Sequence, residues 1–259
     1  MAFTIGAWAQ DVDIAGANTD IDALQDNSLF TSGDDIRVPE YDHLMAAATF
    51  IGSGGNGLSQ ISSPSLRRTQ PIIFSQINGL NDGDVLPDAN VPILDFSRNP
   101  IPLVKSEQLR NTINTNTSAA SFQSTCIFFS GAKIAPVTVT NPVMAYGTNT
   151  DTVTARVWHA LDITYTNTLP SGTYQVVGGR ATSASLIAWR LIFKGSQNSN
   201  RPGAIGTNAV TDFGTGQMFR WGNLGVWGEF SAVTPPSIEV LCNAADSSLI
   251  VQLDLNQVS

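Results

Sequence analysis

Hydrophobic and polar residues alternate along much of this chain, which is the pattern of half-buried β-strands. The longest example lies within 152–166, where the odd positions are mostly apolar and the even positions mostly polar. We predict one long strand there. Further strands are predicted at 61–67, 71–77, 94–96, 101–104, 122–129, 137–140, 173–177, 185–193, 219–221, 224–230, 238–242 and 249–255. Residues 105–117 fit a helix or a strand, and their threonine and asparagine content favours a strand.

These predicted strands recur about every 8–15 residues with turn residues between them, which is typical of an antiparallel sandwich or barrel. Alternating strand and helix units are absent from the pattern, which argues against a doubly wound parallel sheet. Residues 149–259 carry enough strands for one jelly roll, and residues 43–148 are long enough for a second. We therefore predict an all-β fold of two antiparallel jelly-roll sandwiches side by side, divided near residue 148.

Residues 1–42 differ from the rest because they hold nine of the 21 acidic residues and only one cation, Arg37. Asp20 suits the cap of a short helix over 21–25. Pro39 suits the first turn of a second helix that runs to Ala48. The segment is thus predicted to be an acidic, partly helical N-terminal arm. It would serve either as a bridge between subunits or as a solvated extension.

Charge is scarce: only 13% of the residues are charged, against 42% that are hydrophobic, and the net charge is −8. This composition argues against a disordered chain and against a protein that grips nucleic acid through a basic face. Cys126 and Cys242 are expected to be two buried thiols rather than a disulfide. No signal peptide or membrane-spanning segment is recognisable, so we expect synthesis in a cytoplasm.

Motifs for cofactor and metal chemistry are weak. Gly52-x-Gly54-x-x-Gly57 matches the dinucleotide fingerprint as a string, but the residues after it are poor helix formers, so a turn is expected. The loop Asn81-Asp82-Gly83-Asp84 has donor atoms for calcium without the spacing of an EF-hand, and whether it binds an ion stays open. We expect no cofactor and no metal site.

Candidate catalytic residues are equally few. The only histidines are His43 and His159, and His159 falls on the apolar side of a predicted strand, where a packed core role is expected. Glu229, in Trp227-Gly228-Glu229-Phe230, could face a cleft as one carboxylate of a glycosidase pair, or could simply point to solvent. We therefore expect no enzyme and assign no catalytic residue.

Tryptophans gather in the second half, at Trp158, Trp189, Trp221 and Trp227. Aromatic rings on a sandwich face can stack on sugars, which would make a lectin-like module. The same rings also serve as anchors in a core or in a subunit interface, and we favour this second interpretation.

The second half also contains the sequence segments that resemble a known group of proteins. The run Leu169-Pro170-Ser171-Gly172-Thr173-Tyr174-Gln175-Val176-Val177-Gly178-Gly179, then 186–193, then Arg201-Pro202-Gly203, resembles phage structural proteins. The length is similar to that of the smaller double jelly-roll major capsid proteins of icosahedral, membrane-containing bacterial viruses. That resemblance implies two jelly rolls side by side and trimers that form pseudo-hexameric capsomers. It transfers no functional residue.

The sequence therefore predicts a structural virion protein, a phage-like major capsid subunit that self-assembles. Its expected partners are copies of itself, other virion proteins, and an underlying membrane or inner shell, without direct contact to nucleic acid. Two alternatives stay open. One is a carbohydrate-binding, adhesin or spike module that uses the aromatic residues, and the other is a β-sandwich hydrolase that uses Glu229.

Overall fold

The computed structural model describes residues 3–15, 19–26, 29–38, 43–52, 57–66, 72–75, 77–78, 93–115, 118–132, 134–195, 200–206 and 218–259. Within these ranges the chain is all-β with almost no helix, and its strands pair mostly antiparallel, with a short parallel contact between β5 and β8 and an isolated parallel bridge between Ala155 and Cys242. No helix in this part of the chain is long and apolar enough to cross a membrane. The chain forms two compact units, one of residues Gly6–Lys133 and one of Met1–Ile5 with Ile134–Ser259.

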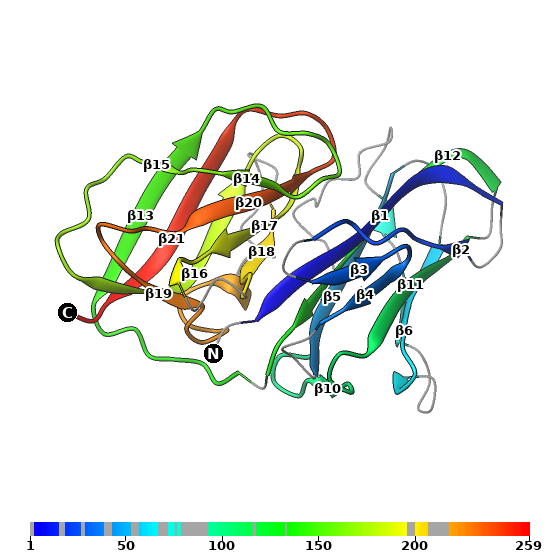
Figure 1. Ribbon diagram of the computed structural model, residues 1–259, viewed down its shortest axis with the longest axis horizontal. Coiled ribbons are helices and arrows are strands. Elements are labelled where there is room, and N and C mark those ends of the chain that lie inside the picture. The colour runs from blue at the N-terminus through cyan, green and yellow to red at the C-terminus, as the bar shows by residue number, and fades with distance from the viewer. Residues whose placement is uncertain are drawn as a thin grey trace. The chain divides into compact units, whose positions relative to one another are not determined.

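The unit of residues 6–133 contains two sheets (Figure 1). The first has the order β1 (Thr4–Ala15), β12 (Ser118–Ser130), β5 (His43–Gly52) and β10 (Ile101–Pro102), and β8 (Ile77–Asn78) and β9 (Leu94–Asp95) also pair with β5. The second has the order β3 (Phe30–Ser32), β4 (Asp35–Arg37), β11 (Gln108–Thr115), β6 (Gly57–Ser62) and β7 (Ile72–Ser75), and β2 (Thr19–Asp20) pairs with β11. Trp8 and Phe128 from the first sheet pack in one core with Ile36 and Ile113 from the second.

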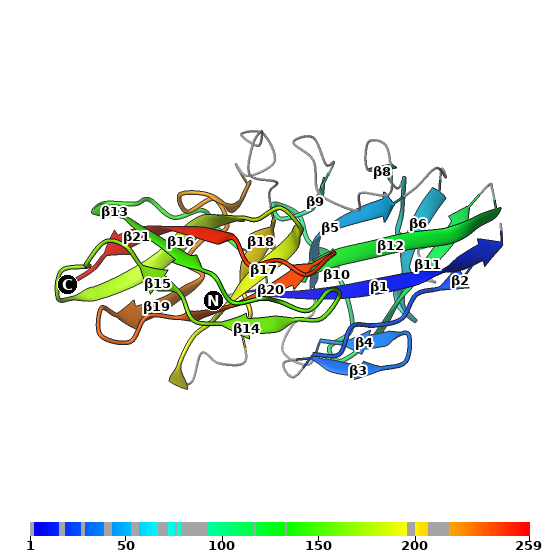
Figure 2. The same ribbon diagram turned by 90° about the horizontal axis from the view of Figure 1, so that it is seen from above.

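The other unit also contains two sheets, of five and four strands. The five-stranded sheet has the order β15 (Thr164–Tyr165), β13 (Pro142–Asn149), β21 (Leu249–Gln257), β16 (Thr173–Thr182) and β19 (Gly228–Ser231). The four-stranded sheet has the order β14 (His159–Leu161), β20 (Ser237–Cys242), β17 (Leu186–Ile192) and β18 (Gly203–Ile205). Figure 2 shows the last strand, β21, between β13 and β16.

Strands in both units pair in a nested order, the first with the last. In the second unit β13 pairs with β21, β14 with β20, β16 with β19 and β17 with β18. In the first unit β1 pairs with β12, β2 and β4 with β11, β5 with β8, β9 and β10, and β6 with β7. Such nesting arises when one long antiparallel ribbon folds over on itself, so that successive pairs fall alternately into the two sheets.

The prediction of helices in the N-terminal segment is wrong for the residues that the structure describes. Residues 21–25 are not helical, and the Ala-rich stretch 43–48 lies within strand β5. The side chains of 44–49 are all buried, so pairing and burial outweigh the helix propensity of alanine. Strands β1 to β4 belong to the sheets of the first unit, and Trp8, Ile21 and Ile36 lie in its core.

The single long strand predicted over 152–166 is also wrong. The chain crosses here between sheets, because β14 pairs with β20 in one sheet and β15 with β13 in the other. Arg156 adopts a left-handed conformation (φ 56°) just before β14. The alternation was genuine, but it belongs to two short half-buried segments and a corner rather than to one strand.

Smaller differences concern strand ends and the boundary between units. Strand β16 runs on through Gly178 and Gly179 with a bulge, where an end was predicted. Segments 137–140 and 219–221 are not strands, and the strand predicted over 224–230 begins only at Gly228. The units divide between residues 133 and 134 rather than near 148, since β13 pairs with β21 of the second unit.

Candidate functional site

The two histidines lie in different units and are both half-buried. His43 is the first residue of β5, and His159 is the first residue of β14, where it pairs with Val240. His159 is therefore packed within a sheet, though less deeply than a core position would be. The hydroxyl of Ser130 donates to the backbone carbonyl of His43 at 2.9 Å, a contact that does not involve the imidazole.

Glu229 lies on β19 with its side chain exposed, opposite Gln175 of β16. The Gln175 amide donates a hydrogen bond to the Glu229 carboxylate at 3.4 Å. This is the solvent-facing position of an amphipathic strand.

The glycine motif near residue 52 is followed by strand β6 instead of a helix, which contradicts a dinucleotide site. Residues 53–56 and the loop 81–84 lie outside the described residues.

Both cysteines are free and buried, as predicted. Burial raises the pKa of Cys126 to about 12 and that of Cys242 to about 11. A thiol with a pKa this high is almost fully protonated at neutral pH and is a poor nucleophile or metal ligand. The described residues include no group of three or more His, Cys, Asp or Glu side chains arranged to hold a metal ion.

The tryptophans of the second half divide between core and surface. Trp189 and Trp227 are buried and contact each other with ring centroids 5.8 Å apart. The guanidinium of Arg190 lies 4.1 Å from the ring centre of Trp158. Only Trp221 is exposed, with 38% of its surface accessible. The core interpretation therefore holds for Trp189 and Trp227, and Trp221 is left as the aromatic candidate for a binding surface.

One face of the five-stranded sheet exposes large apolar side chains. Met144 and Tyr146 on β13 are 46% and 42% exposed, and Ile250 on β21 is 38% exposed. The register pairs Met144 with Asp254 and Tyr146 with Gln252, so these side chains point to the same side. Trp221 lies over this same side, because its backbone N–H donates to the Asp254 carboxylate. We call Met144, Tyr146, Ile250 and Trp221 the outer sheet face.

Asp254 holds Trp221 in place. Its carboxylate accepts two hydrogen bonds from Arg220, at 2.5 and 2.8 Å, and is fully buried. Trp221 itself adopts a left-handed conformation (φ 46°), which costs roughly 1–2 kcal/mol in a residue with a Cβ. Gly222 fixes the turn on both sides, since its N–H donates to Val177 and its carbonyl accepts from Val137. The exposed ring is thus presented by a rigid turn.

Asp246 organises a second polar cluster in this unit. It accepts hydrogen bonds from the hydroxyls of Ser183, Ser185 and Ser248 and from the backbone N–H groups of Ser185 and Ser247. Burial alone would raise the pKa of Asp246, but these hydrogen bonds outweigh it and lower the pKa well below its usual range. The carboxylate is saturated with internal donors and serves to anchor the loop before β21.

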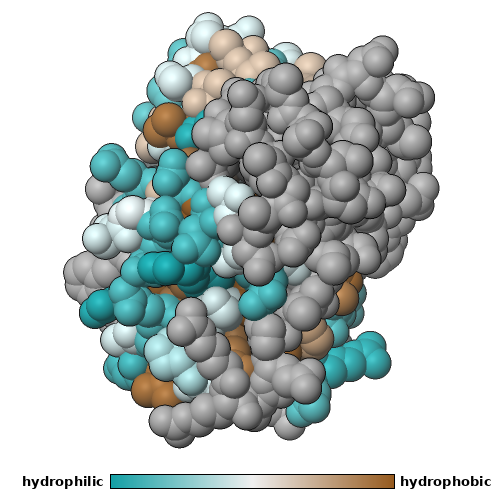
Figure 3. Space-filling model, turned by 90° about the vertical axis from the view of Figure 1, so that its right-hand side faces the viewer, coloured by the Kyte–Doolittle hydropathy of each residue, from teal (hydrophilic) through white to brown (hydrophobic). Residues whose placement is uncertain are grey.

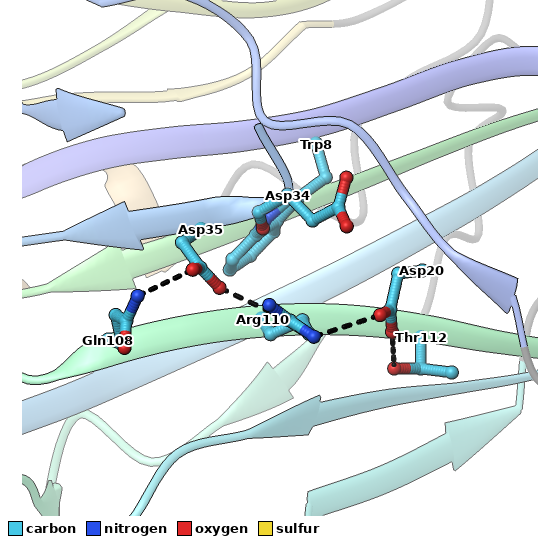
Figure 4. A network of polar contacts seen from close by, with 7 residues as sticks. All are labelled: Trp8, Asp20, Asp34, Asp35, Gln108, Arg110 and Thr112. Carbon is cyan, nitrogen blue, oxygen red and sulfur yellow. Dashed lines mark hydrogen bonds and ion pairs between the residues drawn. The ribbon is translucent and has the colours of Figure 1, made fainter. Parts of the chain in front are cut away.

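In the first unit, several aspartates surround one arginine (Figure 4). Arg110 on β11 forms ion pairs with Asp20 and Asp35, each at 3.0 Å, and Thr112 donates to Asp20. Burial and the neighbouring Asp20 and Asp22 raise the pKa of Asp34. These contacts join β2 and β4 to β11. In the view of Figure 3 the described surface is mainly hydrophilic with scattered hydrophobic residues.

Sequence reasoning missed the residues that hold the second unit together. Arg190 is fully buried and forms a 2.6 Å ion pair with Glu239 of β20. Asp254 of β21 is covered by Arg220 and Trp221, which both donate to its carboxylate. A lone arginine in the apolar run 186–192 is the signal that could have been followed to a buried partner.

Comparison with known proteins adds little. No protein-family model and no curated protein sequence matches the chain. Among solved structures, the crystal structure of the major capsid protein P2 from Bacteriophage PM2 matches with 11% sequence identity and a TM-score of 0.25, over 99% of this chain and 98% of that chain. At this TM-score the likeness supports no functional assignment.

Proposed function

We propose that the chain is a structural virion protein, a phage-like major capsid subunit that acts by self-assembly. The observation that carries this proposal is the nested strand pairing in both units. Pairing of the first strand with the last, the second with the next to last, and so on, over two facing sheets is the arrangement of a jelly roll. Two such units in one chain make a double jelly roll, with the first roll beginning at β1 and the second at β13.

The distribution of charge and apolar surface agrees with an assembly role. Of the described charged residues, Arg110, Arg190 and Arg220 are engaged in ion pairs within their own unit. The outer sheet face offers a methionine, a tyrosine, an isoleucine and a tryptophan without an internal cover. Interface cores are depleted of charge and enriched in aromatic residues and methionine, which fits this composition.

The finer expectations follow from the same proposal. The chain would associate with copies of itself, as trimers of pseudo-hexameric shape, and with other virion proteins in the shell. Its net charge of −8 does not suit neutralisation of packaged nucleic acid, so a membrane or inner shell would lie between this layer and the genome. In this proposal the protein is located in the virion.

The test is the oligomeric state of the wild type and of matched surface variants. We expect light scattering after size exclusion to show trimers or larger species, and electron microscopy to show rings or shells. The double variant Tyr146→Ser, Ile250→Ser should shift the protein toward monomer. Val233→Ser, which changes a side chain that is 84% exposed on a turn, is the control and should leave assembly unchanged. A wild type that stays monomeric at high concentration would contradict the proposal.

One observation favours a second candidate function, glycan binding by a spike or adhesin module. Trp221 presents an exposed ring on a rigid turn, and such rings can stack on the apolar face of a sugar. A glycan array of wild type and Trp221→Ala distinguishes the two functions. Specific binding that is lost in Trp221→Ala, in a protein that does not assemble, would favour glycan recognition over the shell role.

A further inference from the structure

Residues 3–5 pack in the second unit, although the chain that follows them builds the first. Phe3 is fully buried and meets Trp227 edge to face, with ring centroids 5.5 Å apart and an interplanar angle of 81°. Thr4 and Ile5 are buried as well. The second unit thus contains a binding site for a short extended segment, and we call this site the seat. Along the chain, residues 6–133 of the first unit separate this segment from the remainder of the second unit.

Two hydrogen bonds of the Ile5 backbone, one to a main-chain carbonyl and one from an arginine side chain, fix the segment in the seat. The N–H of Ile5 donates to the carbonyl of Arg201 at 3.2 Å. The carbonyl of Ile5 accepts from Nη1 of Arg190 at 2.9 Å. Hydrogen bonds to the main chain of an extended segment, with one of its side chains in a pocket, are a common way to recognise a strand-like peptide. The seat therefore recognises an extended backbone and one aromatic anchor.

The seat is itself built around buried charge. Arg190 is 1% exposed, pairs with Glu239 at 2.6 Å and lies over the ring of Trp158, and Arg201 lies 3.5 Å from the same Glu239 carboxylate. Arg190 and Arg201 share the single carboxylate of Glu239. The carbonyl oxygen of Ile5 therefore provides a further negative partial charge next to the buried Arg190 guanidinium. This preorganised polar cluster is present in the unit of residues 134–259 whichever chain provides the segment.

We propose that this seat binds residues 3–5 of a second copy of the chain as well as those of its own chain, so that assembled copies exchange their N-terminal segments. The segment acts as a tethered ligand, and a tethered ligand is displaced when a free one reaches a comparable effective concentration. In a shell, neighbouring copies hold their segments at such concentrations. Identical contacts made in trans give exchange at low energetic cost. Exchange between copies rests on the proposed self-assembly, whereas recognition of a free segment does not.

The test uses a labelled peptide of residues 1–7 and the full-length chain at a dilution where it does not assemble. Fluorescence anisotropy should show binding to the Phe3→Ala chain, whose own segment lacks its anchor, and weaker binding to wild type, whose seat is filled. A peptide with alanine at the Phe3 position should bind at least about tenfold more weakly, because a buried aromatic anchor dominates such contacts. If Phe3→Ala does not fold, Phe3→Leu keeps apolar bulk in the seat and replaces it.

Absence of peptide binding to these variants, or equal binding of the two peptides, would overturn the proposal. Exchange itself is read from energy transfer between donor-labelled and acceptor-labelled chains after assembly, and excess unlabelled peptide should reduce it. Transfer that the peptide leaves unchanged would contradict exchange. A wild type that never assembles would refute the proposed function while leaving peptide recognition by the seat as a separate result.

Discussion

Two carboxylates of the second unit illustrate how a charge-poor protein tolerates buried acids. Asp246 is surrounded by serine hydroxyls and backbone N–H groups, and Asp254 by the guanidinium of Arg220 and the N–H of Trp221. Both therefore keep a full set of donors in place of water, which is the condition for burying a carboxylate. The two differ in the donor, since one site uses neutral groups and the other a cation.

Asp246→Asn should destabilise the protein by roughly 2 kcal/mol at pH 7, because an amide replaces a charged acceptor that takes several hydrogen bonds. The pKa of Asp246 is lower in the folded state than the unfolded value of about 3.9. Its stabilisation is thus complete above about pH 4 and is lost as the pH falls through the folded pKa. Urea unfolding at pH 7 and pH 3 should show that the difference in free energy of unfolding between variant and wild type is smaller at pH 3 than at pH 7.

Glu229→Gln is the matched control for this experiment, because it makes the same chemical change at an exposed carboxylate of the same unit. Its stability should stay close to that of wild type at both pH values. A gap for Asp246→Asn that is constant with pH would show that its carboxylate charge does not contribute to stability.

Arg220→Ala should cost about 3–5 kcal/mol, since it leaves the fully buried carboxylate of Asp254 without its cation. Arg180→Ala is the comparison on the same sheet, because Arg180 is half-buried and its Nε donates a hydrogen bond to a neutral acceptor, the amide oxygen of Gln252. That variant should lose no more than about 1 kcal/mol. Chemical denaturation measures both, and equal losses would contradict a special role for the Asp254 pair.

At the scale of the element, the period-two pattern predicted strands well and predicted their ends poorly. Strands β17, β20 and β21 lie where the alternating or apolar runs placed them. The prediction of one strand over 152–166 was wrong because a corner between two sheets keeps the same alternation of buried and exposed side chains as a straight strand. The prediction of a helix over 43–48 was wrong because its alanines favour a helix locally, and only long-range pairing with β12 makes them a strand.

The candidate site was less predictable than the fold for a related reason. The outer sheet face depends on which residues of β13 and β21 stand opposite each other, and on a turn far along the chain that folds over Asp254. Register and turn packing are set by tertiary contacts that no local pattern encodes. The exposed Trp221 could be named from the sequence only as one of several tryptophans.

Gly178 tests the packing of this turn on strand β16. A Cβ added there would lie 2.5 Å from the carbonyl oxygen of Phe219 and 2.8 Å from Cα of Arg220. Gly178→Ala should therefore displace the turn and cost roughly 2–3 kcal/mol. In Gly195→Ala the new Cβ meets nothing within 4 Å, and only its left-handed backbone (φ 76°) costs about 1 kcal/mol. Thermal unfolding should rank the two variants in this order, and the reverse order would contradict the close approach.

At the scale of the whole molecule, the nested pairing makes each unit a closed set of strands with its own core. The segment over 1–42 shows how this divides the chain, because β1 from Gly6 onward and β2 to β4 belong to the first unit while residues 3–5 belong to the second. An acidic segment that was predicted to lie outside both sandwiches thus contributes to both. Two of its acids, Asp20 and Asp35, are accommodated within the fold by ion pairs with Arg110.

This division predicts that calorimetry resolves two unfolding transitions, one for each unit. Phe3→Ala should lower the same transition that Arg220→Ala lowers, because Phe3 packs on Trp227, and the loss of a buried phenylalanine costs about 3–5 kcal/mol. Ile36→Ala, in the core of the first unit, should lower the other transition by about 2–5 kcal/mol. If Phe3→Ala instead lowers the transition of Ile36→Ala, the first residues act through the first unit, and the seat in the second unit does not hold them.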